Sequence, residues 1–165
     1  MEEKEYEIAV SRYLDDLYRF ACSVTGNEAD AADVVQVVFM KLASSEKEFE
    51  SGLHLKNWLL KCAANESKSL LRSYWRKHVF SQEDWMENQA VSEDPSLFYI
   101  RDLVSRLSKK DRVIVSLYYW QGYDHKEIGR LLNMNPSAVS TRLMRIRRKL
   151  KTMFTDEEEN DERNR

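Results

Sequence analysis

The sequence predicts an all-α protein of two small helical domains joined by a flexible linker. Only four glycines and two prolines occur in 165 residues, so few chain breakers are available for turns. Apolar residues recur at helical spacing along most of the chain, except in a polar, acidic stretch at residues 80–96. We therefore expect domains at residues 1–79 and 97–155, a linker at 80–96, and a disordered acidic tail at 156–165.

Three helices are expected in the first domain. The first covers roughly residues 5–24, with one apolar stripe made of Val10, Leu14, Leu17, Ala21 and Val24. Asn27 can cap the second helix, whose apolar stripe consists of Ala31, Val34, Val35, Val38, Phe39 and Leu42. A loop is expected at residues 44–54, and a long helix follows at about 56–77.

The second domain contains the elements of a helix-turn-helix. One helix is expected near residues 97–107, and another after Ser108, which begins a capping-box pattern. A short helix at 124–132, a tight turn and a final helix beginning at Asn135 then complete the motif. Gly129 fits this motif as a small residue that lets the two helices approach closely.

Charge is segregated along the chain, although the net charge is only −2. Residues 51–80 carry a net charge of +5 and residues 101–155 a net charge of +9. Residues 81–100, between these basic segments, have a net charge of −5. Such a pattern indicates two separate contacts with nucleic acid.

The final helix has an apolar face and an opposite polar face. Its apolar stripe consists of Val139, Leu143, Ile146 and Leu150. The opposite face begins with short polar side chains suited to base edges and continues with cations suited to phosphates: Ser137, Ser140, Thr141, Met144, Arg145 and Arg148. The alternative is an ordinary amphipathic helix with a solvated basic face, which the preceding short helix and turn disfavour.

The helix at residues 56–77 has a second polar face without an acidic residue. It consists of Asn57, Lys61, Asn65, Lys68, Arg72, Trp75 and Arg76. Lysine and arginine would contact phosphates, asparagine can read base edges, and Trp75 can stack on an unpaired base. The alternative is a solvated lysine-rich face with Trp75 partly buried.

Other functional classes find little support in the sequence. The three histidines share no metal-ligand spacing, and no glycine-rich phosphate loop occurs, so we expect no catalysis, no metal and no cofactor. Cys22 and Cys62 are expected to be small core residues. No apolar run approaches the roughly 20 residues that span a bilayer, and the acidic N-terminus lacks a signal-peptide pattern. We therefore expect a cytoplasmic protein without membrane insertion.

Several segments match a known pattern in order and spacing. They are Asp30–Leu42, Asn57–Asn65 and Leu70–Arg72 in the first domain, and Glu127–Gly129 and Val139–Arg145 in the second. With this layout the chain resembles the sigma-70 family of bacterial RNA polymerase initiation factors, in particular its small extracytoplasmic-function (ECF) group. Val37, Ala43 and Ser140 depart from the family's usual residues, and Ser140 stands where an arginine is frequent.

The resemblance implies a transcription initiation factor that binds core RNA polymerase and directs it to specific promoters. The segment with Asp33, Gln36 and Phe39 would dock on the clamp helices of the β′ subunit, and the β flap is a further implied partner. The loop at about 47–55 and the helix from Asn57 to Arg76, including Lys61 and Asn65, would melt and hold the −10 element. The final helix would read the −35 element in duplex promoter DNA.

Two questions stay open on the sequence alone. One is whether an anti-sigma factor binds the chain. The other is the alternative function of a stand-alone helix-turn-helix regulator that binds duplex operators. Such a regulator would need a ligand pocket or receiver in the first domain, whereas the sequence there favours a docking helix and a strand-melting face.

Overall fold

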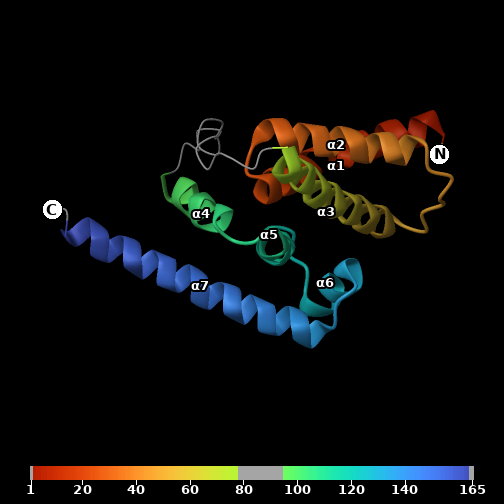
Figure 1. Ribbon diagram of the computed structural model, residues 1–165. Coiled ribbons are helices and arrows are strands. Elements are labelled where there is room, and N and C mark those ends of the chain that lie inside the picture. Colours follow the sequence, from red (N-terminus) through yellow and green to blue (C-terminus); the bar gives the residue numbers. More distant parts are fainter. Residues whose placement is uncertain (1, 78–94, 164–165) are drawn as a thin grey trace. The chain divides into compact units, whose positions relative to one another are not determined.

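The structure is a computed structural model that describes residues 2–77 and 95–163, with the side chains of residues 2–69, 99–157 and 163. All regular elements in these ranges are helices, which confirms the all-α prediction. The chain divides into two compact units, Met1–Ala90 and Val91–Arg165 (Figure 1). The expected linker at residues 80–96 lies outside the described residues, apart from its last two, with which a helix begins.

The first unit is a three-helix bundle. Its helices are α1 (Glu3–Thr25), α2 (Glu28–Ala43) and α3 (Gly52–Lys77), and each packs on the other two (Figure 1). All three helices contribute fully buried side chains, among them Leu17, Phe20, Val34, Val38, Leu42, Leu59 and Leu60. Burial of one such side chain contributes about 1.5–3 kcal/mol, so these apolar faces hold the bundle together.

The apolar stripe expected for the first helix is partly wrong. Leu14 is 41% exposed, whereas Ala9, Tyr13 and Phe20 are buried. The physical reason is that Tyr13 buries its ring and still finds a polar partner, because its hydroxyl donates to the carbonyl oxygen of Gly52 at 2.9 Å. This bond ties α1 to the first residue of α3.

The turn between α1 and α2 forms as predicted. Asn27 caps α2, and its Oδ1 accepts the backbone N–H of Asp30 at 2.7 Å. Gly26 ends α1 in the left-handed region, with φ of 86°, which glycine adopts without strain. The cap confirms the boundary that the sequence predicts.

The long helix α3 begins at Gly52, four residues earlier than predicted. The backbone N–H of His54 donates to Ser51 Oγ at 3.1 Å, so the Ser51 side chain caps the observed start of α3. The preceding loop is held by Phe49, whose ring lies 5.5 Å from that of His54 and 5.6 Å from that of Trp58. This aromatic cluster fixes where the loop enters the helix.

The second unit contains the helix-turn-helix. Its elements are α4 (Pro95–Ser105), α5 (Lys109–Val115), a π-helical turn η1 (Ser116–Trp120), α6 (His125–Leu132) and α7 (Pro136–Arg163). The fully buried side chains of its core come from α5, η1, α6 and α7 and include Ile114, Leu117, Ile128, Val139 and Leu143. This core fixes α7 against the rest of the unit.

The turn between α6 and α7 leaves no space for a larger residue at Gly129. A Cβ atom there would lie 2.6 Å from the carbonyl oxygen of Met134, so the close helix approach expected at Gly129 is confirmed. Asn133 ends α6 in the left-handed region, with φ of 55°. At the other end of α6, Asp124 and Glu127 form the complete capping box that the sequence predicts.

The acidic C-terminal residues differ from the disordered tail that their composition predicts, because α7 continues to Arg163. Phe154 and Glu157 of α7 contact α4 and the residue that follows it. Arg106 Nη1 lies 2.5 Å from Glu157 Oε1, and the ring of Tyr99 lies 5.8 Å from that of Phe154. The structure thus describes residues 156–163 as the end of α7, and composition alone does not reveal the contacts that Phe154 and Glu157 make with another part of the unit.

Candidate nucleic-acid interface

The first half of α7 presents a buried face and an exposed face, as predicted. Val139 and Leu143 are 0% exposed and Ile146 is 2% exposed. The six residues expected to face DNA are all exposed: Ser137, Ser140, Thr141, Met144, Arg145 and Arg148. Met144, with 51% of its surface exposed, is a large apolar side chain that has no place in the core. The exposed face is therefore accessible to a DNA groove.

Ser137 is exposed and also forms hydrogen bonds at the start of α7. Asn135 Oδ1 accepts the backbone N–H of Ser137 at 3.0 Å and the Ser137 hydroxyl at 2.9 Å. The hydroxyl proton is thus used to cap α7, and the oxygen remains as an acceptor. In this structure Ser137 stabilises the start of the helix before it contacts any partner.

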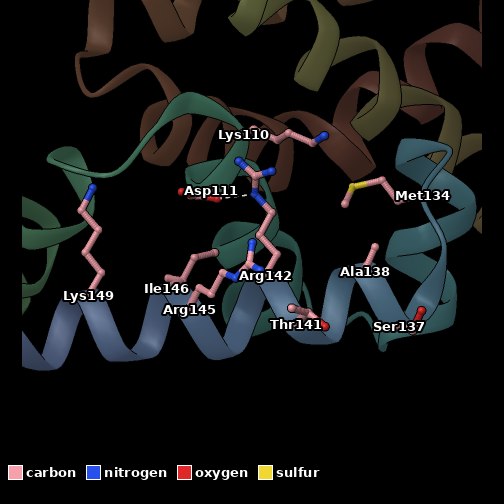
Figure 2. A pocket seen from close by; sticks show the side chains of 10 residues that line it. All are labelled: Lys110, Asp111, Met134, Ser137, Ala138, Thr141, Arg142, Arg145, Ile146 and Lys149. Atoms are coloured by element: carbon pink, nitrogen blue, oxygen red, sulfur yellow. Dashed lines mark hydrogen bonds and ion pairs between the residues drawn. The ribbon is translucent and has the colours of Figure 1, made fainter.

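A groove runs between α5 and the first turns of α7 (Figure 2). Its lining contains four cationic side chains and one carboxylate, and consists of Lys110, Asp111, Met134, Ser137, Ala138, Thr141, Arg142, Arg145, Ile146 and Lys149. Three of the predicted residues, Ser137, Thr141 and Arg145, lie in this groove. The excess of cations makes it suited to a polyanion.

Sequence reasoning missed the role of Arg142. Its Nε lies 2.5 Å from Asp111 Oδ1, which joins α7 to α5 across 31 residues of sequence. The capping box expected at Ser108 forms only in part: Ser108 Oγ accepts the N–H of Asp111 at 3.2 Å, while the Asp111 carboxylate binds Arg142 instead. The available signal was the aspartate at this position, whose side chain is one methylene shorter than the usual glutamate.

The polar face of α3 is described for four of its seven predicted residues. Lys61 and Asn65 are exposed, and Asn57 and Lys68 are half-buried. The side chains of the other three lie outside the described residues; they are Arg72, Trp75 and Arg76. Lys61 and Asn65, one helical turn apart, therefore form the outermost described part of this face.

An ion pair borders the α3 face. Lys41 of α2 donates to Glu66 of α3, and this contact raises the pKa of the Lys41 ammonium. Glu66 is the acid nearest in sequence to Asn65, and its charge is matched by Lys41. The carboxylate is thereby prevented from opposing an approaching phosphate with its full charge.

The three residues predicted to bind polymerase do not share one environment. Asp33 and Gln36 are exposed on α2, whereas Phe39 is only 5% exposed and meets the ring of Tyr6 at 6.4 Å. The Phe39 side chain belongs to the core of the bundle, and its docking on a partner stays a prediction. Met40, which sequence reasoning missed, is 62% exposed and follows Gln36 by one turn on the same face.

Both units match families of known sequences. Residues 9–77 match the family described as Sigma-70 region 2, and residues 97–150 match Sigma-70, region 4. The chain is 28% identical to RNA polymerase sigma factor CarQ of Myxococcus xanthus over 156 residues, which covers 90% of this chain and 88% of CarQ. It is 26% identical to ECF RNA polymerase sigma factor SigM of Bacillus subtilis, covering 86% of this chain and 90% of SigM.

Solved structures share the fold. The sigma factor RpoE of Bartonella quintana, solved with the anti-sigma factor NepR, has a TM-score of 0.77 at 24% identity, covering 92% of this chain and 98% of RpoE. CnrH, solved with the cytosolic domain of CnrY, has a TM-score of 0.66 at 21% identity, covering 94% of this chain and 90% of CnrH. With a helix-turn-helix in one unit, a three-helix bundle in the other and both sigma-70 regions matched in order, the chain belongs to the sigma-70 family of RNA polymerase sigma factors, in its ECF group.

Proposed function

We propose that this chain binds core RNA polymerase and directs it to a specific set of promoters. The observation that carries the proposal is the exposed face of α7, the second helix of the helix-turn-helix, whose opposite apolar face is buried in the core of the unit. An exposed polar helix face in this motif is the arrangement that enters the major groove of duplex DNA. Its relatives CarQ and SigM are named RNA polymerase sigma factors, which supports the same activity here.

The second domain, residues 97–155, would read the −35 element. Arg145 can donate two hydrogen bonds to guanine, and Met144 can contact a thymine methyl group. Ser140 and Thr141 can each bond to a base edge, and Arg148 is placed further along α7 for a phosphate. Because Ser140 stands where the family often has an arginine, we expect its promoter preference to differ from that of its relatives.

The first domain, residues 1–79, would hold the −10 element as a single strand. Lys61 would contact a phosphate and Asn65 a base edge, since both are exposed on one face of α3. The surface around Asp33, Gln36 and Met40 would dock on the clamp helices of β′, with the apolar Met40 at its centre. Residues 80–96 would link the two domains.

Further parts of the proposal concern partners and location. The β flap of polymerase is a second proposed contact, and an anti-sigma factor is a proposed regulator, because RpoE and CnrH were each solved with a partner protein. We propose that the chain acts in the cytoplasm and catalyses no reaction by itself. Among the described residues, no helix is both long and apolar enough to cross a membrane.

The test is transcription in vitro with purified bacterial core polymerase and a library of genomic promoter fragments. The folded wild-type chain should produce start sites that core polymerase alone does not produce. A chain that binds duplex DNA equally well without polymerase, and adds no start sites, would instead be a stand-alone regulator. That alternative is disfavoured, since both matched regions are sigma-70 regions.

A further inference from the structure

The groove between α5 and α7 contains an arginine whose guanidinium is oriented by a carboxylate. Figure 2 shows Arg142 extending from α7 toward Asp111 of α5, so its side chain lies inside the groove. Both partners are partly shielded, with 35% of the Arg142 side chain and 17% of the Asp111 side chain exposed. The pair is thus better protected from solvent screening than an ordinary surface ion pair.

The ion pair with Asp111 uses only part of the Arg142 guanidinium, so its other donors can bind a ligand. The Asp111 carboxylate accepts a hydrogen bond from Nε of Arg142. A guanidinium carries four further N–H donors on its two Nη atoms, arranged to match the oxygens of a phosphate. The position of Asp111 is also stabilised locally, because its backbone N–H donates to Ser108 Oγ at 3.2 Å. The carboxylate therefore sets the direction in which the remaining donors point.

The charges around Arg142 favour an anion. Asp111 is the one carboxylate among the groove-lining residues, and it is already paired, whereas Lys110, Arg145 and Lys149 add three more cations. Lys110 lies across the groove from α7, on α5 (Figure 2). A phosphate that enters here would meet positive charge from both helices.

We propose that Arg142 and Lys110 form a subsite for one backbone phosphodiester of the DNA, with Asp111 as the residue that positions Arg142. The proposal rests on the proposed function, because it needs α7 to lie in a duplex groove. It assigns Arg142 to the phosphate backbone and not to a base, since its side chain turns toward α5 and its Nε is occupied. Pre-orientation by Asp111 reduces the side-chain freedom that is lost on binding.

The first test measures how the affinity for promoter DNA depends on salt, with the full-length chain and core polymerase. Replacing Arg142 by alanine should lower affinity about tenfold on a promoter and on the same fragment with a scrambled −35 element alike. The slope of log affinity against log salt should fall by about 1, since one fewer phosphate is neutralised. Arg101→Ala is the matched control, because Arg101 is exposed on α4 outside the groove, and it should change neither quantity.

Two outcomes would overturn the phosphate subsite. One is an Arg142→Ala variant with the wild-type salt slope. The other is a loss confined to one base pair of the −35 element, which would make Arg142 a base-reading residue. Should Arg142→Ala fail to fold, Lys110→Ala removes an exposed cation from the same subsite and should lower the slope by about 1.

A second test distinguishes the positioning of Arg142 by Asp111 from the effect of the Asp111 charge on the groove. Asp111→Ala makes the groove more positive, so electrostatics alone predicts tighter binding to DNA. If Asp111 orients Arg142, the same variant should bind several-fold more weakly, and Asp111→Asn should restore most of the affinity because its amide oxygen can still accept from Nε. Tighter binding by both variants would reject the positioning role.

The failures of the two proposals can be distinguished. A wild-type chain that adds no start sites with core polymerase rejects the proposed function, and the salt slope on non-specific duplex then still decides whether Arg142 contacts phosphate. A wild-type chain that initiates at promoters, together with an unchanged slope for Arg142→Ala, rejects only the subsite.

Discussion

In the second unit, two arginines of α7 are held by side chains from other elements, whereas the outermost described cation of α3 lies on an exposed helix face. Arg142 is bound by Asp111, and Arg147 Nε donates to the hydroxyl of Tyr119 at 2.8 Å. Lys61, on α3, is exposed and is carried by a flexible stem.

This difference matches the two kinds of nucleic acid that the proposed function assigns to the two helices. Duplex DNA presents phosphates in a regular geometry, so a guanidinium fixed in advance can fit it with little further ordering. A melted strand has a variable backbone, and exposed lysines that adjust their position suit it better. Arg142 and Lys61 thus differ in how rigidly their charged groups are placed.

The largest expected effect is a loss of stability in the first unit, while the second unit stays folded. Phe39→Asp buries a charge in the three-helix core and should destabilise that bundle by more than about 3 kcal/mol. Met40→Asp, one residue further on, should leave stability unchanged and weaken binding to core polymerase about tenfold. Hydrogen exchange read peptide by peptide distinguishes the two, and equal loss of protection in both variants would place Met40 in the core as well.

The next largest effect is a loss of stability in the second unit. Gly129→Ala places a Cβ atom 2.6 Å from the Met134 carbonyl oxygen, so the turn must shift at a cost of about 1–3 kcal/mol. Binding to the −35 element should fall, while exchange protection in the first unit stays as in the wild type. Arg130→Ala, an exposed neighbour on α6, serves as control. A Gly129→Ala variant with wild-type thermal stability would show that the turn adapts without strain.

A smaller effect sharpens the comparison between the two faces. Arg145→Ala should lose about 1–3 kcal/mol of discrimination at one position of the −35 element. Lys61→Ala should instead weaken the open complex similarly on all promoters and reduce its salt dependence. Competition among promoter variants measures both, and unchanged selectivity for Arg145→Ala would remove this residue from the base-reading set.

The smallest effect concerns the end of α7. Hydrogen bonds from Tyr99 and Arg106 hold the pKa of Glu157 below its ordinary value of 4.5. A carboxyl with a lowered pKa in the folded state adds stability above that ordinary value, and the contribution is lost as pH falls through the lower, folded pKa. Because this pair is near the surface, we expect under about 1 kcal/mol. In thermal melts followed with pH, Glu157→Gln should flatten this acid-side decline, and an unchanged profile would contradict the contact.

Much of the local structure could be predicted from residue types. Asn27 and Asp124 form caps because their short side chains reach a backbone N–H three residues on, whatever the rest of the chain does. The apolar stripe of α7 was correct because its spacing leaves only one continuous face for burial. Gly129 was recognised because a tight helix-turn-helix excludes a side chain there.

Other features depend on partners that are distant in sequence. The spacing of apolar residues already places Phe39 on the buried stripe of α2, but only the packing of α1 gives its ring the contact with Tyr6. Near the acidic end of α7, Phe154 and Glu157 contact Tyr99 of α4 and Arg106, the residue that follows α4.

The sequence by itself therefore determined the helical class, most helix boundaries and the exposed face of α7, since these follow from periodicity and from contacts within a few residues. Only the tertiary structure decided that Arg142 meets Asp111, which makes α5 part of the groove. The physical reason is that an ion pair across 31 residues depends on how two helices pack, and neither residue's local pattern contains that information.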